Sequence, residues 1–75
     1  MYIRIRELRE DHDLTQLQVA DYLNMSQTGY SKYETGENDI PTRVLIKLSE
    51  LYKTNIDYLL GQTDIAKPYT RTQIK

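Results

Sequence analysis

The stretch Leu14–Gly36, LTQLQVADYLNMSQTGYSKYETG, most constrains how this chain can fold, because it contains two short helical patterns around a tight turn. Thr15 is a good N-cap for the first pattern, with Gln18 three residues later as a weak capping-box partner. Asn24 accepts a left-handed backbone, so it can turn the chain sharply after that helix. Ser26 is a good N-cap for the second pattern. The stretch therefore predicts two short helices joined by a sharp bend.

The side chains of these two helices divide into an inward and an outward set. A steeply crossing pair needs a small residue at the crossing, and Ala20 is the only alanine in the first 60 residues. We expect the inward set to be Val19, Ala20, Leu23, Met25, Tyr30 and Tyr33. The second helix, from Ser26 to about Glu34, carries an outward set of Gln27, Thr28, Ser31 and Lys32. These four could be an ordinary solvated face, but on a protruding helix they could reach the base edges of DNA.

Three further helical patterns flank this stretch. Apolar residues at helical spacing predict helices over about 2–12 and 41–53, and a brief one over 56–60. The remaining residues 62–75 are polar and show no period, so we expect a flexible tail. The sequence thus predicts an all-α fold, a compact bundle of five short helices with a central helix-turn-helix, in one domain over residues 1–61.

Composition excludes several classes of protein. The 75 residues include no Cys, so disulfides and thiolate metal sites are excluded. No apolar run approaches the roughly 18 residues of a membrane span, and the N-terminus lacks the apolar block of a secretion signal. We therefore expect a soluble, cytoplasmic domain without membrane contact.

The charge distribution bears on any nucleic-acid function. The chain has a net charge of −1, whereas nucleic-acid binders are usually basic. Residues 1–61 carry seven Lys and Arg against ten Asp and Glu, and residues 62–75 carry three against one. A DNA-binding face must therefore be a local positive patch helped by the N-termini of helices.

Catalysis and metal binding have no support in the sequence. His12 is the only His, and it falls near the end of the first expected helix, between Asp11 and Asp13. A lone His in that position is usually a surface residue that suits the helix dipole. No second His, no Cys and no activated Ser accompanies it. We expect no enzyme activity, no metal and no cofactor.

Over about residues 3–61, the chain resembles the lambda-repressor-like, Cro-type (XRE-type) helix-turn-helix family of bacterial and phage transcriptional regulators. Many residues at family positions carry this resemblance: Leu14-Thr15-Gln16, Val19-Ala20, Leu23, Met25-Ser26-Gln27, Tyr30, Tyr33-Glu34, Gly36, Pro41, Leu45, Leu48 and Asp57-Tyr58-Leu59-Leu60-Gly61. The resemblance implies a compact all-α domain that binds double-stranded DNA.

The resemblance also implies roles for the outward residues. Gln27, Thr28 and Lys32 hold positions that usually read bases, with Ser31 a weaker candidate. Gln16 would contact a phosphate and brace the recognition helix, and Ser26 would cap that helix near a phosphate. The chemistry is compatible with these roles, because Gln suits adenine and Lys suits guanine. The N–H groups where the second and third helices begin, after Thr15 and Ser26, can bind phosphates without Lys or Arg.

Two further features follow from the family positions. Arg9 and Glu34 would form a buried ion pair between the first helix and the end of the recognition helix. Tyr58 and Leu59 belong to a region through which relatives commonly dimerise, so we expect a homodimer, at least on DNA.

Some residues depart from the family pattern. Asn24 replaces the usual Gly in the turn, and Leu17 stands where relatives usually have a polar residue. The loop 37–39, Glu-Asn-Asp, is acidic where relatives often place cations, which argues for modest affinity. The leading hypothesis is a sequence-specific DNA-binding regulator, most simply a small repressor of a pseudo-palindromic operator. The alternative is a protein-interaction module, or an antitoxin-like partner protein, with the same fold.

Overall fold

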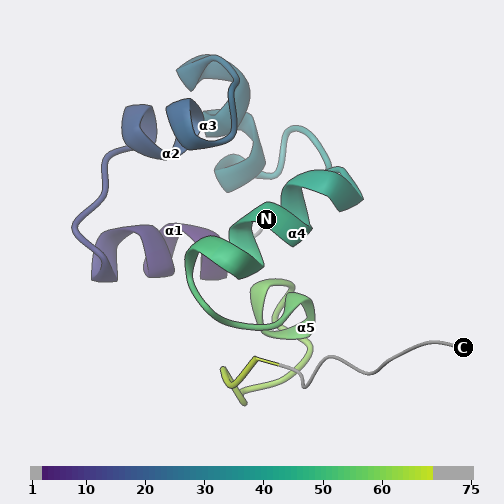
Figure 1. Ribbon diagram of the computed structural model, residues 1–75. Coiled ribbons are helices and arrows are strands. Elements are labelled where there is room, and N and C mark those ends of the chain that lie inside the picture. The colour runs from purple at the N-terminus through teal and green to yellow at the C-terminus, as the bar shows by residue number, and fades with distance from the viewer. Residues whose placement is uncertain (1–2, 69–75) are drawn as a thin grey trace, which may run out of the picture.

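The computed structural model describes residues 3–68, which form five helices and no strand. The helices are α1 (Ile3–Asp11), α2 (Gln16–Tyr22), α3 (Gln27–Thr35), α4 (Thr42–Leu51) and α5 (Ile56–Leu59). Figure 1 shows α2 and α3 together at one end, with α1 and α4 beneath them and α5 beyond α4. The predicted all-α bundle is confirmed. None of the helices in residues 3–68 has the length and apolar character to cross a membrane.

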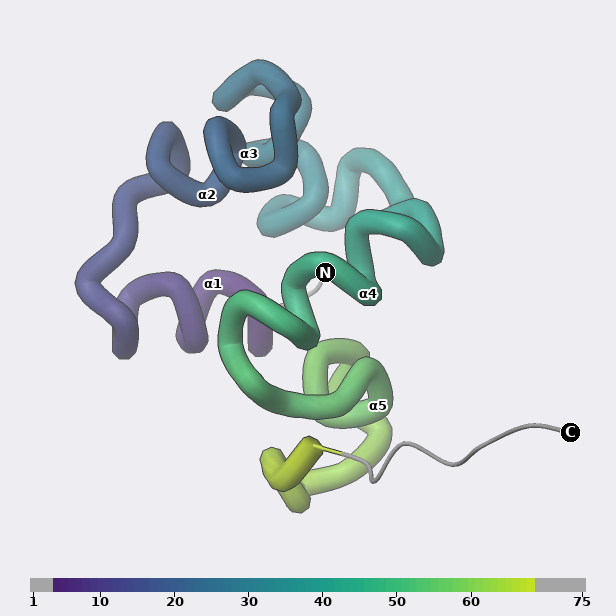
Figure 2. The backbone as a smooth tube through the Cα atoms, in the orientation of Figure 1, coloured from purple at the N-terminus to yellow at the C-terminus, as the bar shows by residue number. Residues whose placement is uncertain are grey.

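The turn between α2 and α3 has the geometry that its residues predict (Figure 2). Thr15 Oγ1 accepts a hydrogen bond from Gln18 N at 3.1 Å, and Gln18 Oε1 accepts one from Thr15 N at 2.8 Å. Asn24 has a φ of 59°, in the left-handed region. Ser26 Oγ then accepts a hydrogen bond from Gly29 N at 3.0 Å. Both caps are therefore in place, and they determine where each helix begins.

The ends of α4 differ from the sequence prediction. Pro41 was expected in the first helical turn, but it has an extended backbone with ψ of 150° and occupies the N-cap position, so the helix begins at Thr42. At the other end, α4 stops at Leu51 and Tyr52 is its C-cap. Lys53 follows with a φ of 52°, a left-handed conformation that cannot continue an α-helix. The apolar stripe of α4 extends past the helix, which is why the sequence alone overestimated its length.

A single apolar core joins all five helices. Ala20, Tyr30, Ile5, Leu48 and Leu59 have no exposed surface, so each helix contributes at least one fully buried side chain. The predicted inward set is confirmed, because Val19, Leu23 and Tyr33 are also buried and Met25 packs against the core. α1 packs against α3 and α5, and α4 packs against α5. This core supports the α2–α3 pair from below.

The segment after α5 is attached to the domain through two buried side chains. Thr54 Oγ1 donates a hydrogen bond to Ala66 O at 2.6 Å. Asn55 Nδ2 donates to Ile65 O and to Lys67 O, each at 2.8 Å. Figure 2 shows this segment turning back beneath α5. Residues 65–67 of the predicted tail therefore contact the domain, and residues 69–75 lie outside the described part of the chain.

Candidate nucleic-acid interface

One open surface groove gathers the residues that the sequence singled out for base contacts. It is lined by side chains from the start of α2, the outer face of α3 and the loop after α3: Gln16, Gln27, Thr28, Ser31, Lys32 and Glu37. We call this surface the α3 groove. Gln27, Thr28 and Lys32 are exposed, whereas Gln16 and Ser31 are half-buried. Four base-contact candidates and the phosphate-contact candidate thus lie on one surface.

The two caps determine where α2 and α3 begin. Thr15 and Ser26 are exposed, and each has an extended backbone immediately before a helix. The first N–H groups of a helix have no partner within that helix. They carry the positive end of its dipole, which favours an anion there. A phosphate beside the start of α3 would therefore be stabilised without a cationic side chain.

Below the α3 groove, Glu34 connects three helices. Arg9 Nε lies 2.6 Å from Glu34 Oε2, and Arg9 Nη2 donates to Glu34 Oε1 at 3.2 Å. Tyr30 Oη donates to Oε2 at 2.7 Å, and Gln16 Nε2 donates to Oε1 at 3.1 Å. Only 3% of the Glu34 side chain and 12% of the Arg9 side chain are exposed. The structure therefore contains the Arg9–Glu34 ion pair that the family resemblance implied, and Gln16 is held by the same carboxylate.

The ionisation of this cluster favours a charged pair. Burial raises the pKa of Glu34, but hydrogen bonds from Arg9, Tyr30 and Gln16 outweigh burial, so its pKa lies below the ordinary glutamate value. The hydrogen bond to Glu34 raises the pKa of Arg9. Burial, followed by the charge of Glu34, raises the pKa of Tyr52 to about 12. Glu34 is therefore a carboxylate and Tyr52 a neutral phenol at neutral pH.

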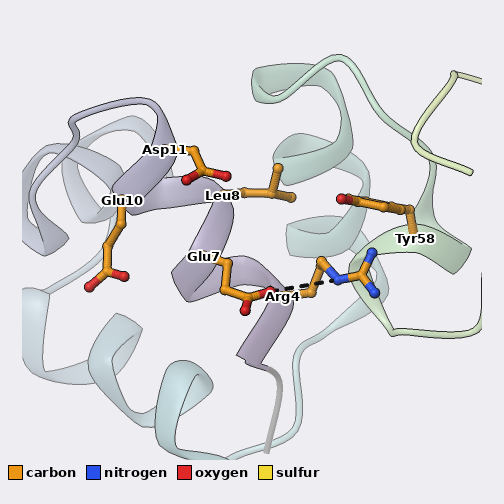
Figure 3. A pocket seen from close by; sticks show the side chains of 6 residues that line it. All are labelled: Arg4, Glu7, Leu8, Glu10, Asp11 and Tyr58. Atoms are coloured by element: carbon orange, nitrogen blue, oxygen red, sulfur yellow. Dashed lines mark ion pairs between the residues drawn. The ribbon is translucent and has the colours of Figure 1, made fainter. Parts of the chain in front are cut away.

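The two residues expected at a dimer contact have different surroundings. Leu59 has no exposed surface and belongs to the core, so its side chain cannot contact a partner. The expectation for Leu59 is wrong, because this side chain closes the core at α5. Tyr58 is half-buried, and the Arg4 guanidinium lies over its ring at 4.0 Å. Figure 3 shows Arg4 between the Tyr58 ring and Glu7, to which its Nε is 3.9 Å away.

The His12 ring contacts two parts of the fold, the backbone of α1 and the ring of Tyr52. Its Nδ1 lies 2.8 Å from Leu8 O, and its ring centroid is 5.1 Å from that of Tyr52. Among the described residues, no three His, Cys, Asp or Glu side chains are grouped so that they could hold a metal ion.

Two features of the site were missed by reasoning from the sequence. The first is the contact of Tyr30 with Glu34, although a spacing of four residues on one helix places side chains on the same face. The second is the presence of Glu37 in the α3 groove. The sequence marked the loop 37–39 as acidic, but which of its residues lines the groove depends on how the chain leaves α3 at Gly36, whose φ is 83°.

Comparison with known proteins decides the family. A family model described as helix-turn-helix matches residues 5–59, from α1 to the end of α5. The chain belongs to this helix-turn-helix family. The fold therefore agrees with the resemblance to Cro-type regulators, and the matched residues include the whole α3 groove.

Two similar proteins are named as HTH-type transcriptional regulators. The chain is 39% identical over 64 residues to the HTH-type transcriptional regulator ImmR of Bacillus subtilis (strain 168), covering 85% of this chain and 50% of ImmR. It is 37% identical over 65 residues to the uncharacterized HTH-type transcriptional regulator YobD of the same organism, covering 87% of this chain and 58% of YobD.

A phage protein is also among the relatives. The chain is 36% identical over 59 residues to the cryptic phage CTXphi transcriptional repressor RstR of Vibrio cholerae, covering 79% of this chain and 53% of RstR. The chain thus spans about half the length of the curated relatives it matches. No solved structure matches the chain significantly. Sequence similarity therefore establishes the family to which the chain belongs.

Proposed function

We propose that this protein is a sequence-specific repressor that inserts α3 into the major groove of double-stranded DNA. The observation that carries the proposal is the α3 groove, which gathers Gln27, Thr28, Ser31 and Lys32 with Gln16 on one exposed surface. The name of RstR as a transcriptional repressor supports the direction of regulation. α3 is nine residues long, and its first two turns carry the four candidate base-contact residues on the outer face: Gln27, Thr28, Ser31 and Lys32.

The side chains of α3 suit base edges in different ways. Gln27 can form two hydrogen bonds with adenine, through N7 and the N6 amino group. Lys32 suits the O6 and N7 acceptors of guanine, and Thr28 offers a methyl group to thymine. Gln16 sits at the start of α2 and is held by Glu34, so we assign it to a phosphate rather than to a base. Base contacts give specificity, whereas phosphate contacts set the position of the domain on the duplex.

We further propose that two copies bind a pseudo-palindromic operator as a homodimer. A twofold axis would place two copies of α3 about 34 Å apart, one turn of B-DNA. With Leu59 in the core, the face around Tyr58 is the part of α5 available for such a contact. Each copy presents few cationic side chains to DNA, so the affinity of one copy for DNA should be modest. Binding by two copies would compensate for this.

Selection from a pool of random duplexes tests the proposal. The expected result is a motif with two related half-sites whose centres are about 10 base pairs apart. Binding to the selected duplex should weaken steeply as salt rises, because phosphate contacts release counterions. Enrichment of no half-site would refute the proposal, and an affinity insensitive to salt would favour a protein partner instead.

Three variants then separate the assigned roles. Gln27→Ala and Lys32→Ala should each lose about 1–3 kcal/mol of preference at particular base pairs. Gln16→Ala should weaken binding to all DNA sequences equally, because a phosphate contact carries no sequence information. Lys47→Ala is the matched control for Lys32→Ala, since Lys47 is exposed on α4 and does not line the α3 groove. Equal loss of preference in both lysine variants would contradict the role of Lys32.

A further inference from the structure

Glu37 brings a negative charge into the α3 groove. Gly36 ends α3 in the left-handed conformation, so the chain turns back and Glu37 lies beside Gln27, Lys32 and the other residues lining that groove. Among the described residues that line it, Glu37 alone is acidic. A surface that binds a polyanion gains nothing from a carboxylate unless the carboxylate has a specific partner.

The Glu37 carboxylate lies beside the Thr35 hydroxyl. Its Oε1 accepts a hydrogen bond from Thr35 Oγ1 at 3.2 Å, and its backbone N donates to the same hydroxyl at 3.4 Å. The other carboxylate oxygen can still accept a hydrogen bond. The Thr35 hydroxyl also lies 3.3 Å from Lys32 O and has one proton to donate, so the carboxylate is an acceptor placed at the groove rather than one locked by this bond.

The chemistry of the groove makes this acceptor unlike its neighbours. Gln27, Thr28, Ser31 and Lys32 can all donate hydrogen bonds, whereas a carboxylate can only accept them. In the major groove the donors on base edges are the exocyclic amino groups, cytosine N4 and adenine N6. Guanine O6, thymine O4 and the phosphates offer only acceptors or negative charge to a carboxylate.

We propose that Glu37 is a specificity-determining residue, which accepts a hydrogen bond from an exocyclic base amino group and repels DNA that lacks one at that position. This inference rests on the proposed function and adds a second source of specificity to it. On unrelated DNA the carboxylate only repels phosphates. On the operator, the base contact offsets the repulsion between Glu37 and the phosphates. The main effect of Glu37 is therefore to weaken non-specific binding.

Two substitutions separate charge from hydrogen bonding, with a matched control elsewhere. Glu37→Gln removes the charge but retains an acceptor, and Glu37→Ala removes both. Asp21→Asn removes one charge from α2 at an exposed residue that does not line the groove. Binding is measured for the selected operator, for a scrambled duplex of equal length, and for operators with each base pair replaced in turn. Circular dichroism melting establishes that each variant is folded.

Both Glu37 variants should bind the scrambled duplex about three- to tenfold more tightly, the effect of removing one nearby like charge. Their affinity for the operator should rise less, so the ratio of operator to scrambled binding falls. Glu37→Ala should also lose a preference of about fivefold or more at one base pair that presents an amino group. The replaced operators show whether that base is cytosine or adenine. Asp21→Asn should change the affinity for both duplexes by the same small factor.

Two results would overturn the proposal in distinguishable ways. If the wild-type protein selects a motif but Glu37→Ala keeps every base preference and an unchanged specificity ratio, the role of Glu37 is refuted and the proposed function stands. If the wild-type protein selects no motif, the proposed function fails and the role of Glu37 fails with it.

Discussion

Removing the Glu34 carboxylate should cost more stability than any other single change at a polar residue of this domain. Glu34→Ala leaves Arg9 with one hydrogen bond, to Leu14 O at 2.9 Å, and without its counter-ion. The Arg9 side chain is only 12% exposed, so water cannot replace the carboxylate fully. Breaking a buried pair by removing one partner costs about 3–5 kcal/mol. Tyr30 Oη and Gln16 Nε2 also lose their acceptor.

The assay is thermal and urea unfolding followed by circular dichroism. In a domain this small each kcal/mol shifts Tm by about 4–8 °C, so Tm of Glu34→Ala should fall by at least about 12 °C. Glu10→Ala is the control, because Glu10 pairs with Arg6 at 3.3 Å in an exposed position. Exposed pairs contribute at most about 1 kcal/mol. A Tm for Glu34→Ala equal to that of Glu10→Ala would refute the reasoning.

The same carboxylate predicts a dependence of stability on pH. The pKa of Glu34 is lower in the folded protein than its ordinary value, so the folded state favours the ionised form. Its stabilisation is therefore complete above the ordinary glutamate pKa of about 4.3 and is lost as pH falls through the lower folded value. Urea unfolding from pH 7 to pH 3 should show a steeper loss for wild type than for Glu34→Gln, whose amide does not titrate. Parallel curves would contradict this linkage.

Three more changes probe the loops. Asn55→Ala should destabilise by about 1–3 kcal/mol, because Asn55 caps α5 and binds two carbonyls of the following segment; urea unfolding measures the loss, and an unchanged midpoint would contradict it. Lys53→Gly should raise Tm, since Lys53 holds a φ of 52° that costs a side-chain-bearing residue about 1 kcal/mol or more; a lower Tm would disprove this. Gly61→Ala should lower stability by a similar amount through backbone strain alone, because its φ is 75° and an added Cβ would meet nothing within 4 Å; calorimetry showing no loss would count against it.

Local signals predicted the part of the site that depends on neighbouring residues. The caps at Thr15 and Ser26, the turn at Asn24 and the inward tyrosines all follow from short-range chemistry and helical periodicity. The outward face of α3 follows from the same periodicity once Tyr30 and Tyr33 are placed inside. Such features are encoded within a few residues, so a single sequence contains them.

Features that depend on distant contacts could not be predicted in this way. Leu59 was a candidate dimer contact because the family resemblance places it in a region through which relatives commonly dimerise, yet the core of this domain extends under α5 and buries it completely. The anchoring of residues 65–67 depends on Thr54 and Asn55 meeting backbone carbonyls 10 to 12 residues later. No periodicity marks such contacts, because the donors lie in a connection between helices.

The two glutamates at the candidate interface bear differently on the proposed DNA binding. Glu34 lies under the α3 groove, but its charge is compensated by Arg9, so it orients Gln16 without presenting a net negative field to phosphates. α1 therefore contributes to the interface although it carries none of the groove residues. Glu37 is exposed at the groove itself and its hydrogen-bond partner is a neutral hydroxyl, so no cation compensates its charge in that contact. In the proposed complex, affinity would come from Lys32, from helix N-termini and from two copies acting together, while the negative charge at Glu37 would make unrelated DNA a poorer ligand than the operator.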